Sequence, residues 1–577
     1  MRTKSLILAG LALAALVSCS KENKENPVFS GDKAYINVNI AYSDAATRGT
    51  GDATNPFYFG TASEYDVLSA HFFFYNADGT FAAYASKAKS EMKFTANGTD
   101  EATKNNIESV ASGVVVLEGL KSTNYPSYMA VVLNPSTGMV DALKNKSISQ
   151  AQAYIINAIA TEGTSTTWSN FVMTSSTYDN DDAATGYFCE KLQPNNFQEV
   201  EDEAVKDANT VTAYVERLAA KVKLGLGDEI SNAKGKIGSF SVDGKATDLY
   251  FSITGWGLDA TAKSSYTFKN INPSWSFNGF TWNDQTNHRS YWAEFPEYGV
   301  NDNTVYYPKD YNSVVSSKKT PTLNYVSYND LAVALNGAAY CRENTNTEAV
   351  LKAVNFSGAV TSVLLQAKVT DASGNAIQLV NYGKKLYTYD EYVKKALADY
   401  AENHPNDLIF VGPATPDATS VYTQISTENV ESQNAYDGDI TLKAKALDSD
   451  KSYYLQSGNT YETKTAAEVT EYLIENNGTL AEYYKDGMMY YNIPIEHLNN
   501  GAKYTASDFV TNMKEATYGV VRNHYYMITV TGISNLGKAV YEAEEDIVPS
   551  DDDIKNYYVG AKVNILSWKV VKQEVNL

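Results

Sequence analysis

The chain is poor in the residues that usually cross-link a fold or hold a metal. Its 577 residues include only three cysteines, five histidines and 14 prolines. The histidines are scattered without metal-ligand spacing, and no His-Glu-x-x-His, nucleophile-elbow or phosphate-loop pattern occurs. Asp and Glu are so numerous that pairing any two as acid and base would be arbitrary. We therefore predict that the chain is not an enzyme and has no cofactor.

Positive charge is also in short supply. Lys and Arg number 47 against 68 Asp and Glu, which gives a net charge of −21. This balance excludes nucleic acid and anionic membrane surfaces as partners of first choice. The length suits two or three domains, and the 44 tyrosines, with frequent Asn, Thr and Ser, favour β structure.

The one long apolar run lies at the start. A basic segment, Met1–Lys4, precedes the apolar run Leu6–Val17, and Leu16–Cys19 has the form of a lipobox. The run is too short to span a membrane stably, so residues 1–18 are predicted to be a cleaved lipoprotein signal with Cys19 as the lipidated first residue. An ordinary secretory signal with a chance cysteine is the alternative. The charged segment that follows resembles the tether of surface-exported lipoproteins.

Only Cys189 and Cys341 remain in the mature chain. They could pair, but sequence alone cannot place them within bonding distance. Two isolated buried thiols is the favoured interpretation.

A strand and an exposed loop follow the signal. Ile36, Val38 and Ile40 alternate with asparagines, the period of a strand with one buried face. After Tyr42 the chain is small and polar around Arg48, a composition that favours an exposed loop open to proteolysis.

Further along, apolar patterns predict strands and a few helices. The expected strands are 66–75 with an Asp-Gly hairpin turn, 114–117, 128–133, 171–174, 211–226 with a bulge near 216–217, 237–242, 249–254, 290–295, 363–369, 489–495, 520–533 and 559 onward. The expected helices are 141–160, 389–402 and 466–485. A Gly-, Asp- and Lys-rich stretch at 225–236 suggests a boundary between domains 49–230 and 231–577. The fold class predicted is mainly β, with two β-sandwich domains and helical insertions.

Two further segments carry candidate functions. The acidic loop at Asn180–Asp182 could bind calcium, but it lacks the closing glutamate of an EF-hand loop, so a solvated loop is the default. The C-terminal segment is an apolar β segment that could pair with another chain; the alternative is a last strand within its own sheet. Its apolar residues are Ala561, Val563, Ile565, Trp568, Val570, Val575 and Leu577.

Six short motifs resemble one family, the Mfa-like and FimA-like fimbrillins, which are subunits of type V pili. The motifs lie in order across almost the whole mature chain, at Val215–Val222, Arg289–Ala293, Tyr340–Thr345, Tyr490–His497, Tyr518–Tyr526 and Ile533–Gly537.

The resemblance implies transthyretin-like sandwiches and a lipidated precursor with a pro-segment, residues 19–48. It implies that an arginine-specific, trypsin-like protease cuts between Arg48 and Gly49 and so removes the strand with Ile36, Val38 and Ile40. The C-terminal strand of another copy would then fill the groove, giving a homopolymer with anchor and tip subunits. The expected place is the outer membrane, then an extracellular adhesive fimbria whose ligand is unknown. The alternative is a non-polymerising surface lipoprotein adhesin, such as a tip or anchor subunit or a glycan-binding protein.

Overall fold

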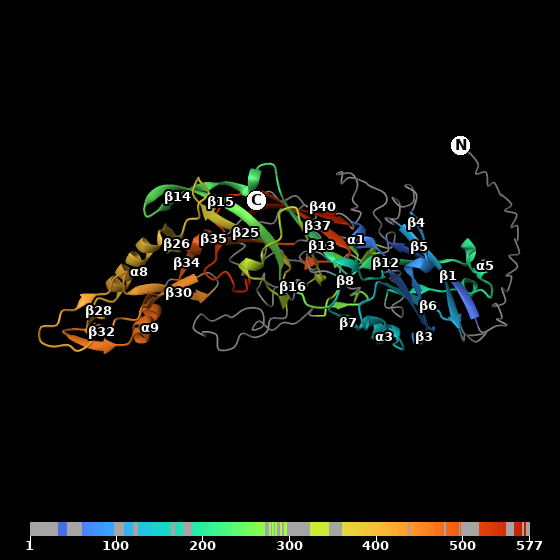
Figure 1. The fold of residues 1–577 in the computed structure, drawn as a ribbon, viewed down its shortest axis with the longest axis horizontal. Helices are drawn as coiled ribbons and strands as arrows, with labels where there is room; N and C mark the ends of the chain where they lie inside the picture. Colours follow the sequence, from blue (N-terminus) through green and yellow to red (C-terminus); the bar gives the residue numbers. More distant parts are fainter. Residues whose placement is uncertain are drawn as a thin grey trace, which may run out of the picture.

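The structure is a computed structural model. It describes residues 33–42, 61–96, 109–118, 125–162, 168–176, 187–271, 276–277, 280–281, 283–284, 289–290, 293–296, 323–345, 360–436, 439–477, 480–495, 497, 519–549, 559–567 and 571–572. This part of the chain is elongated, with the N-terminal strands at one end and a helix-bearing insertion at the other (Figure 1). Large curled sheets dominate it, so the prediction of a mainly β fold with helical insertions is confirmed.

The N-terminal region is one curled sheet. Eight strands follow the order β3-β2-β6-β10-β12-β1-β5-β4, and β11 also pairs with β6. Alternating apolar residues of β1, β2, β5, β6 and β12 point to the inside of the curl and form its core. The strands are β1 (Lys33–Tyr42), β2 (Ser69–Tyr75), β3 (Phe81–Ala88), β4 (Lys93–Ala96), β5 (Ser109–Glu118), β6 (Tyr128–Leu133), β10 (Met173–Ser175), β11 (Glu190–Lys191) and β12 (Val211–Arg217).

The other face of β2 and β6 is covered by short elements. The helix predicted over 141–160 is wrong as one element: α3 (Met139–Leu143) and α4 (Ile148–Gln152) are separate, and β7 (Ile155–Ile156) follows. The break has a local cause, because Asn145 has a φ of 62° and Ser147 caps α4 by accepting a hydrogen bond from the Gln150 backbone N–H. A strand predicted over 171–174 is likewise two strands, β9 (Ser169–Phe171) and β10.

The predicted bulge near 216–217 is a crossing between sheets. β12 ends at Arg217 and β13 (Ala220–Leu226) begins in a different sheet. The two residues between them bond to opposite sides: the Leu218 N–H donates to the Val172 carbonyl at 3.0 Å, and the Ala219 carbonyl accepts from the Asn523 N–H at 2.7 Å. Alternation changes phase here because the chain moves from one core to the next.

The C-terminal region packs two sheets around a second core. One sheet has the order β23-β13-β37-β39-β40, and the other β30-β31-β34-β26-β27-β14-β15-β25-β35-β38. The predicted strand 520–533 is two strands, because a turn with Asn523 at a φ of 59° separates them. The strands are β14 (Lys234–Val242), β15 (Lys245–Asp259), β23 (Ala338–Cys341), β25 (Ser362–Thr370), β35 (Met488–Pro494), β36 (Gly519–Val520), β37 (His524–Ile533), β38 (Lys538–Ala539), β39 (Val559–Ser567) and β40 (Val571–Lys572).

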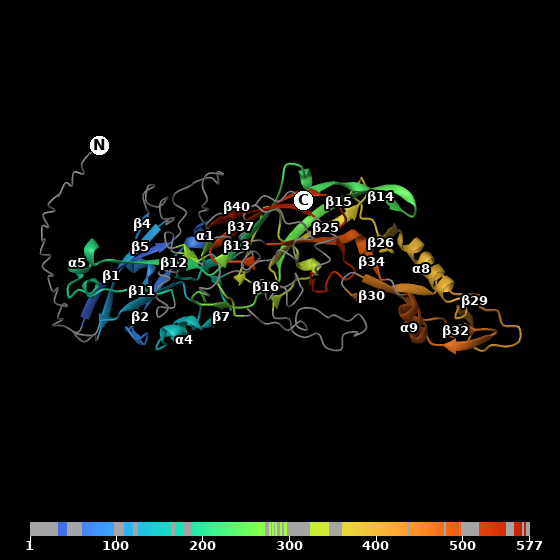
Figure 2. The same ribbon diagram turned by 180° about the vertical axis from the view of Figure 1, so that it is seen from behind.

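The helix-bearing insertion leaves this region between two neighbouring strands. β26 (Leu379–Tyr382) and β34 (Ala481–Tyr484) pair antiparallel, and the chain between them forms its own core (Figures 1 and 2). The predicted helix over 389–402 is confirmed as α8 (Tyr389–Asn403). The helix predicted over 466–485 ends early, as α9 (Ala466–Asn477), where the sequence carries an Asn-Gly stop signal. The remaining strands are β27 (Lys385–Tyr387), β28 (Ile409–Pro413), β29 (Thr423–Gln424), β30 (Val430–Tyr436), β31 (Asp439–Ala444), β32 (Lys451–Ser457) and β33 (Thr460–Lys464).

Two sequence expectations lie partly or wholly outside this description. Of the strand expected at 290–295, only Ser290 lies in a described strand, β21 (Arg289–Ser290). The acidic loop at Asn180–Asp182 falls outside the described residues. Among the residues described, no helix is long and apolar enough to cross a membrane, and no group of three potential metal ligands gathers.

Candidate assembly site

β1 is an interior strand of the curled sheet although it comes first in the chain. It pairs antiparallel with β5 along its whole length, from Lys33 opposite Glu118 to Tyr42 opposite Ser109. On its other side it runs parallel to β12, with Val38 opposite Val211. A strand bonded on both edges cannot leave without unpairing two neighbours.

The residues predicted to form the buried face of β1 do so. Ile36, Val38 and Ile40 are at most 1% exposed and pack in the core inside the curl. Burial of three such side chains stabilises β1 in place by roughly 5–9 kcal/mol, counted at ~1.5–3 kcal/mol each as an upper estimate.

Polar contacts fix the register of β1. The Asn37 side-chain amide donates to Thr210 Oγ1 at 2.9 Å, just before β12 begins. Tyr35 and Gln198 exchange both backbone hydrogen bonds, at 2.8 and 2.9 Å. These bonds continue the pairing of β1 past the first residue of β12, so both edges of β1 are occupied there as well.

The structure does not describe the residues predicted for lipidation and cleavage, nor several of those predicted for the donor strand. Cys19, Arg48 and Gly49 lie outside the described residues, as do Trp568, Val570, Val575 and Leu577. Their roles stay predictions.

The rest of the predicted donor segment lies in a sheet of its own chain. β39 pairs antiparallel with β37, with Ala561 opposite Val530 and Val563 opposite Ile528. Ile565 follows opposite Tyr526, and β40 turns back onto β39. β37 has a second partner in β13, which runs parallel to it.

Four of the sequence motifs meet where β12 crosses into β13. Arg522 of the Tyr518–Tyr526 motif forms a fully buried ion pair with Glu343 of the Tyr340–Thr345 motif. Glu216, from Val215–Val222, pairs with Lys269 at 2.8 Å, and both are buried. Alongside, His497 from the Tyr490–His497 motif hydrogen-bonds Tyr526 at 2.8 Å. Residues far apart in the chain thus form one buried polar junction between the N- and C-terminal cores.

Sequence reasoning missed one member of this junction, Glu64. It lies in α1 (Ala62–Tyr65) and is fully buried, with Lys221 Nζ 2.6 Å from its Oε1. Burial raises the pKa of this carboxyl, but the Lys221 charge and hydrogen bonds from Lys221, Tyr340 and Thr61 outweigh it, so the pKa lies below its ordinary value of 4.5. The stabilisation is therefore present at neutral pH and is lost as the pH falls through that lowered pKa. A lone Glu in a polar segment carries no sequence signal for this role.

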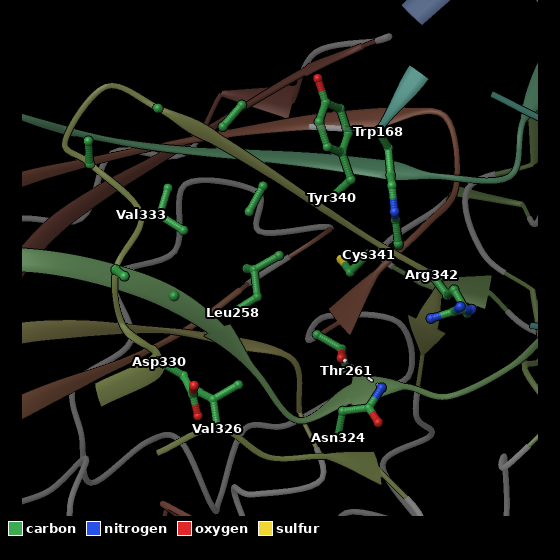
Figure 3. Close-up of a pocket in the computed structure, with 16 residues that line it drawn as sticks. Trp168, Leu258, Thr261, Asn324, Val326, Asp330, Val333, Tyr340, Cys341 and Arg342 are labelled. Atoms are coloured by element: carbon green, nitrogen blue, oxygen red, sulfur yellow. Dashed lines mark hydrogen bonds between the residues drawn. The ribbon is translucent and has the colours of Figure 1, made fainter. Parts of the chain in front are cut away.

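A pocket of about 680 Å³ lies beside β23 and the end of β15 (Figure 3). Leu258, Val333 and Cys341 form apolar walls. Arg342 at one end lies 6.0 Å from the Trp168 ring centre and donates to the Ala262 carbonyl at 3.3 Å. Asp330, the one carboxylate among the described lining residues, accepts hydrogen bonds from Ser327, so these residues form no convergent acid–base pair.

Cys189 and Cys341 are both buried and do not form a disulfide with each other. Burial raises the pKa of Cys341 to about 12, which suppresses the reactive thiolate. This agrees with the interpretation of two isolated thiols.

The Glu190 carboxyl in the curled sheet should make the stability of the fold depend on pH. Burial raises the pKa of Glu190 in β11 from 4.5 to about 7, against the opposing charge of Lys191. The folded chain therefore binds a proton between these values that the unfolded chain does not, and the Glu190 contribution to stability rises as the pH falls from 8 towards 5. We expect Glu190→Gln to increase the free energy of unfolding at pH 8 by about 1–3 kcal/mol and to have little effect at pH 5.

Denaturant titrations of both proteins at the two pH values measure this difference. Burial lowers the pKa of His71 to about 4, so its contribution to stability changes with pH in the opposite direction. This contribution is the same in both proteins and cancels when they are compared. Glu203→Gln, in an exposed pair with Lys206, is the control. Equal differences at pH 8 and pH 5 would contradict the assignment.

Comparison with known proteins bears on the region that holds β35, β37 and β39. Residues 482–574 match the family model described as major fimbrial subunit protein type IV, fimbrillin, C-terminal. The resemblance to the fimbrillins is confirmed. The fimbrillin match includes Ala561, Val563 and Ile565 of β39. No curated protein sequence matches the chain.

Solved structures with a similar course include fimbrial and adhesion proteins. A putative cell adhesion protein from Parabacteroides distasonis ATCC 8503 is 10% identical, with 94% of this chain and 99% of that chain covered and a TM-score of 0.36. A fimbrilin (fimA) from Porphyromonas gingivalis W83 is 12% identical, with 94% of this chain and 98% of that chain covered and a TM-score of 0.36. The tip fimbrial protein Mfa3 from Porphyromonas gingivalis with C-terminal truncation is 11% identical, with 93% of this chain and 100% of that chain covered and a TM-score of 0.34. Likeness at this level is too low to transfer a role from those proteins to this one.

Proposed function

We propose that this chain is a structural subunit of an adhesive surface fimbria that polymerises by strand replacement. It is exported as a precursor lipidated at Cys19 and is cut after Arg48. The released segment takes β1 with it, and the C-terminal strand of another copy fills the vacated groove. The fimbrillin match over residues 482–574 supports the family, and the interior position of β1 is the single observation that carries the mechanism.

Loss of an interior strand creates a specific acceptor. Without β1, both β5 and β12 expose unpaired backbone N–H and C=O groups that face each other across an apolar floor. Two facing edges bind one strand more tightly than the single edge of an ordinary sheet, because each backbone group of the new strand finds a partner.

The chain carries a second strand with the pattern of the first. Val38-Asn39-Ile40 in β1 recurs as Val563-Asn564-Ile565 in β39. With these residues aligned, Ile36 corresponds to Ala561, and the apolar positions stay in phase. A strand that reproduces the alternation of β1 suits the same groove.

Proteolysis supplies the trigger in this scheme. In the precursor, β1 is linked to β2 by the chain between them, so its local concentration at the groove is high and no separate strand can compete. A cut after Arg48 makes β1 a free peptide that is lost by dilution once it dissociates. The C-terminal strand of another subunit then binds irreversibly on the time scale of assembly.

The pairing of β39 with β37 favours a second candidate function. A subunit whose last strand stays in its own sheet would accept a partner without donating one, as a tip subunit or other surface adhesin does. The first proposal, a polymerising subunit of the fimbrial stalk, requires β39 to leave β37. After that, β37 still pairs with β13.

Replacement of the arginine tests the proposal. The Arg48→Ala chain is expected to reach the surface as a lipidated monomer and to form no detergent-resistant ladders, because β1 stays tethered in its groove. Mass spectrometry of native surface material should find Gly49 as the N-terminus. Arg48→Lys is the matched control: an arginine-specific protease leaves it uncut, whereas added trypsin restores assembly. Ladders from Arg48→Ala chains with an intact N-terminal segment would refute the mechanism.

A further inference from the structure

The short helix α1 begins at Ala62, in the part of the chain that follows the proposed cut, and is held by Glu64. Tyr340 Oη donates to Glu64 Oε1 at 2.5 Å, and Lys221 Nζ lies 2.6 Å from the same oxygen. The Glu64 carbonyl accepts from Arg217 Nε at 2.7 Å. The Thr61 N–H donates to Oε2 and closes the helix start.

These partners come from strands of both sheets. Arg217 ends β12, which lines the groove of the N-terminal sheet, while Lys221 and Tyr340 lie in β13 and β23 of the C-terminal sheet. The views of the whole chain place α1 beside β12, β13 and β37 (Figures 1 and 2). Glu64 therefore bridges the two sheets: its carboxylate binds β13 and β23 of the sheet that holds β39, and its backbone carbonyl binds the end of β12 in the sheet that accepts a strand.

Charge makes this bridge hard to open. Glu64 is fully buried and the Lys221 side chain is 5% exposed, so separation of the pair would leave an uncompensated charge away from water. The nearby pairs Glu216–Lys269 and Arg522–Glu343 are buried in the same junction. By contrast, the pair of Asp66 and Lys89, only two residues further along, is exposed and contributes little.

We propose that Glu64 is an interdomain latch that fixes the acceptor sheet to the donor sheet and keeps the chain after the cut in place. Loss of β1 then opens the groove without loosening the junction, and only residues 49–60 are released from their N-terminal connection. The statement about the cut rests on the proposed function; the latch between the sheets does not.

The distance between the N- and C-terminal regions reports on the latch. Spin labels at Lys93→Cys in β4 of the acceptor sheet and at Lys245→Cys in β15, whose sheet shares a core with the donor sheet, measure this distance by pulsed electron resonance. The protein is the uncut, full-length monomer with Cys19→Ser; both label sites are exposed, and Cys189 and Cys341 are buried. We expect one narrow distance distribution for the parent and for the control Asp66→Asn. Glu64→Gln is expected to broaden the distribution at least twofold.

A milder variant protects the test against unfolding. Tyr340→Phe removes the hydroxyl that donates to Glu64 and keeps the ring, so it should fold and broaden the distribution in the same direction but less. A parent-like, narrow distribution in folded Glu64→Gln or in Tyr340→Phe would overturn the latch. The same labels, diluted among unlabelled chains and cut after Arg48, should keep the narrow distribution; broadening there would overturn its role after the cut. If the cut chains stay monomeric and keep the narrow distance distribution, only the polymerisation proposal is contradicted.

Discussion

A Val38→Asp precursor is expected to lose about 4 kcal/mol or more of the stability of its N-terminal sheet. Val38 is fully buried between Gly113 of β5 and Val211 of β12, where a carboxylate has neither water nor a cationic partner in the described core. A charge placed in such a site is among the few single changes with effects this large. Denaturant unfolding followed by a probe in the curled sheet measures it.

The same variant should assemble into polymers of normal stability once it is cut. Residue 38 leaves with the pro-segment, so the finished groove contains no trace of the substitution. Asn39→Asp is the matched control, since this half-buried neighbour points to the other face and should cost less than 1 kcal/mol. If the polymers of Val38→Asp dissociate more readily than those of the parent, β1 remains in the assembled subunit and strand replacement is wrong.

Removal of residues 559–577 is expected to produce a subunit that terminates growth. The truncated chain keeps its groove, so after cleavage it accepts a strand, but it has none to donate. The monomer should stay folded at reduced stability, because β37 still pairs with β13 and the core residues Tyr526, Ile528 and Val530 remain in place. The truncated protein alone should form no ladders.

Mixtures of truncated and intact chains allow the effect on polymer length to be measured. One truncated copy per intact copy should shorten detergent-resistant ladders to a few subunits, as seen by electrophoresis without heating. A synthetic peptide of residues 559–577 should bind the cut chain and block assembly, whereas the same peptide with Val563→Asp should not. Ladders of undiminished length in the mixture would mean that another segment is the donor, and collapse of the truncated monomer would favour a last strand that belongs to its own sheet.

The sequence predicted best what short-range periodicity encodes. β1, β6 and α8 follow from alternation or helical spacing within a few residues, and the structure has them with nearly the expected bounds. It predicted poorly wherever distant residues decide. The break at Leu218 looked like a bulge because a change of phase is the same whether a strand bulges or crosses to another sheet.

The candidate site divides in the same way. The buried face of Ile36, Val38 and Ile40 could be predicted, but its parallel partner Val211 could not, since the pairing of residues 173 positions apart is set by tertiary packing. Glu64 was invisible because one acidic residue in a polar stretch looks the same whether it meets water or Lys221. Sequence patterns mark apolar faces, whereas buried ion pairs depend on which segments the fold brings together.

The insertion between β26 and β34 has a mechanical consequence. It begins after Tyr382 and ends before Ala481, two residues that pair directly with each other, at the end of the molecule away from β1. In the proposed fibre, tension would pass from the groove through the junction to β39 and would bypass this insertion. Its surface could therefore change, or carry foreign sequence, in each subunit without weakening the proposed polymer.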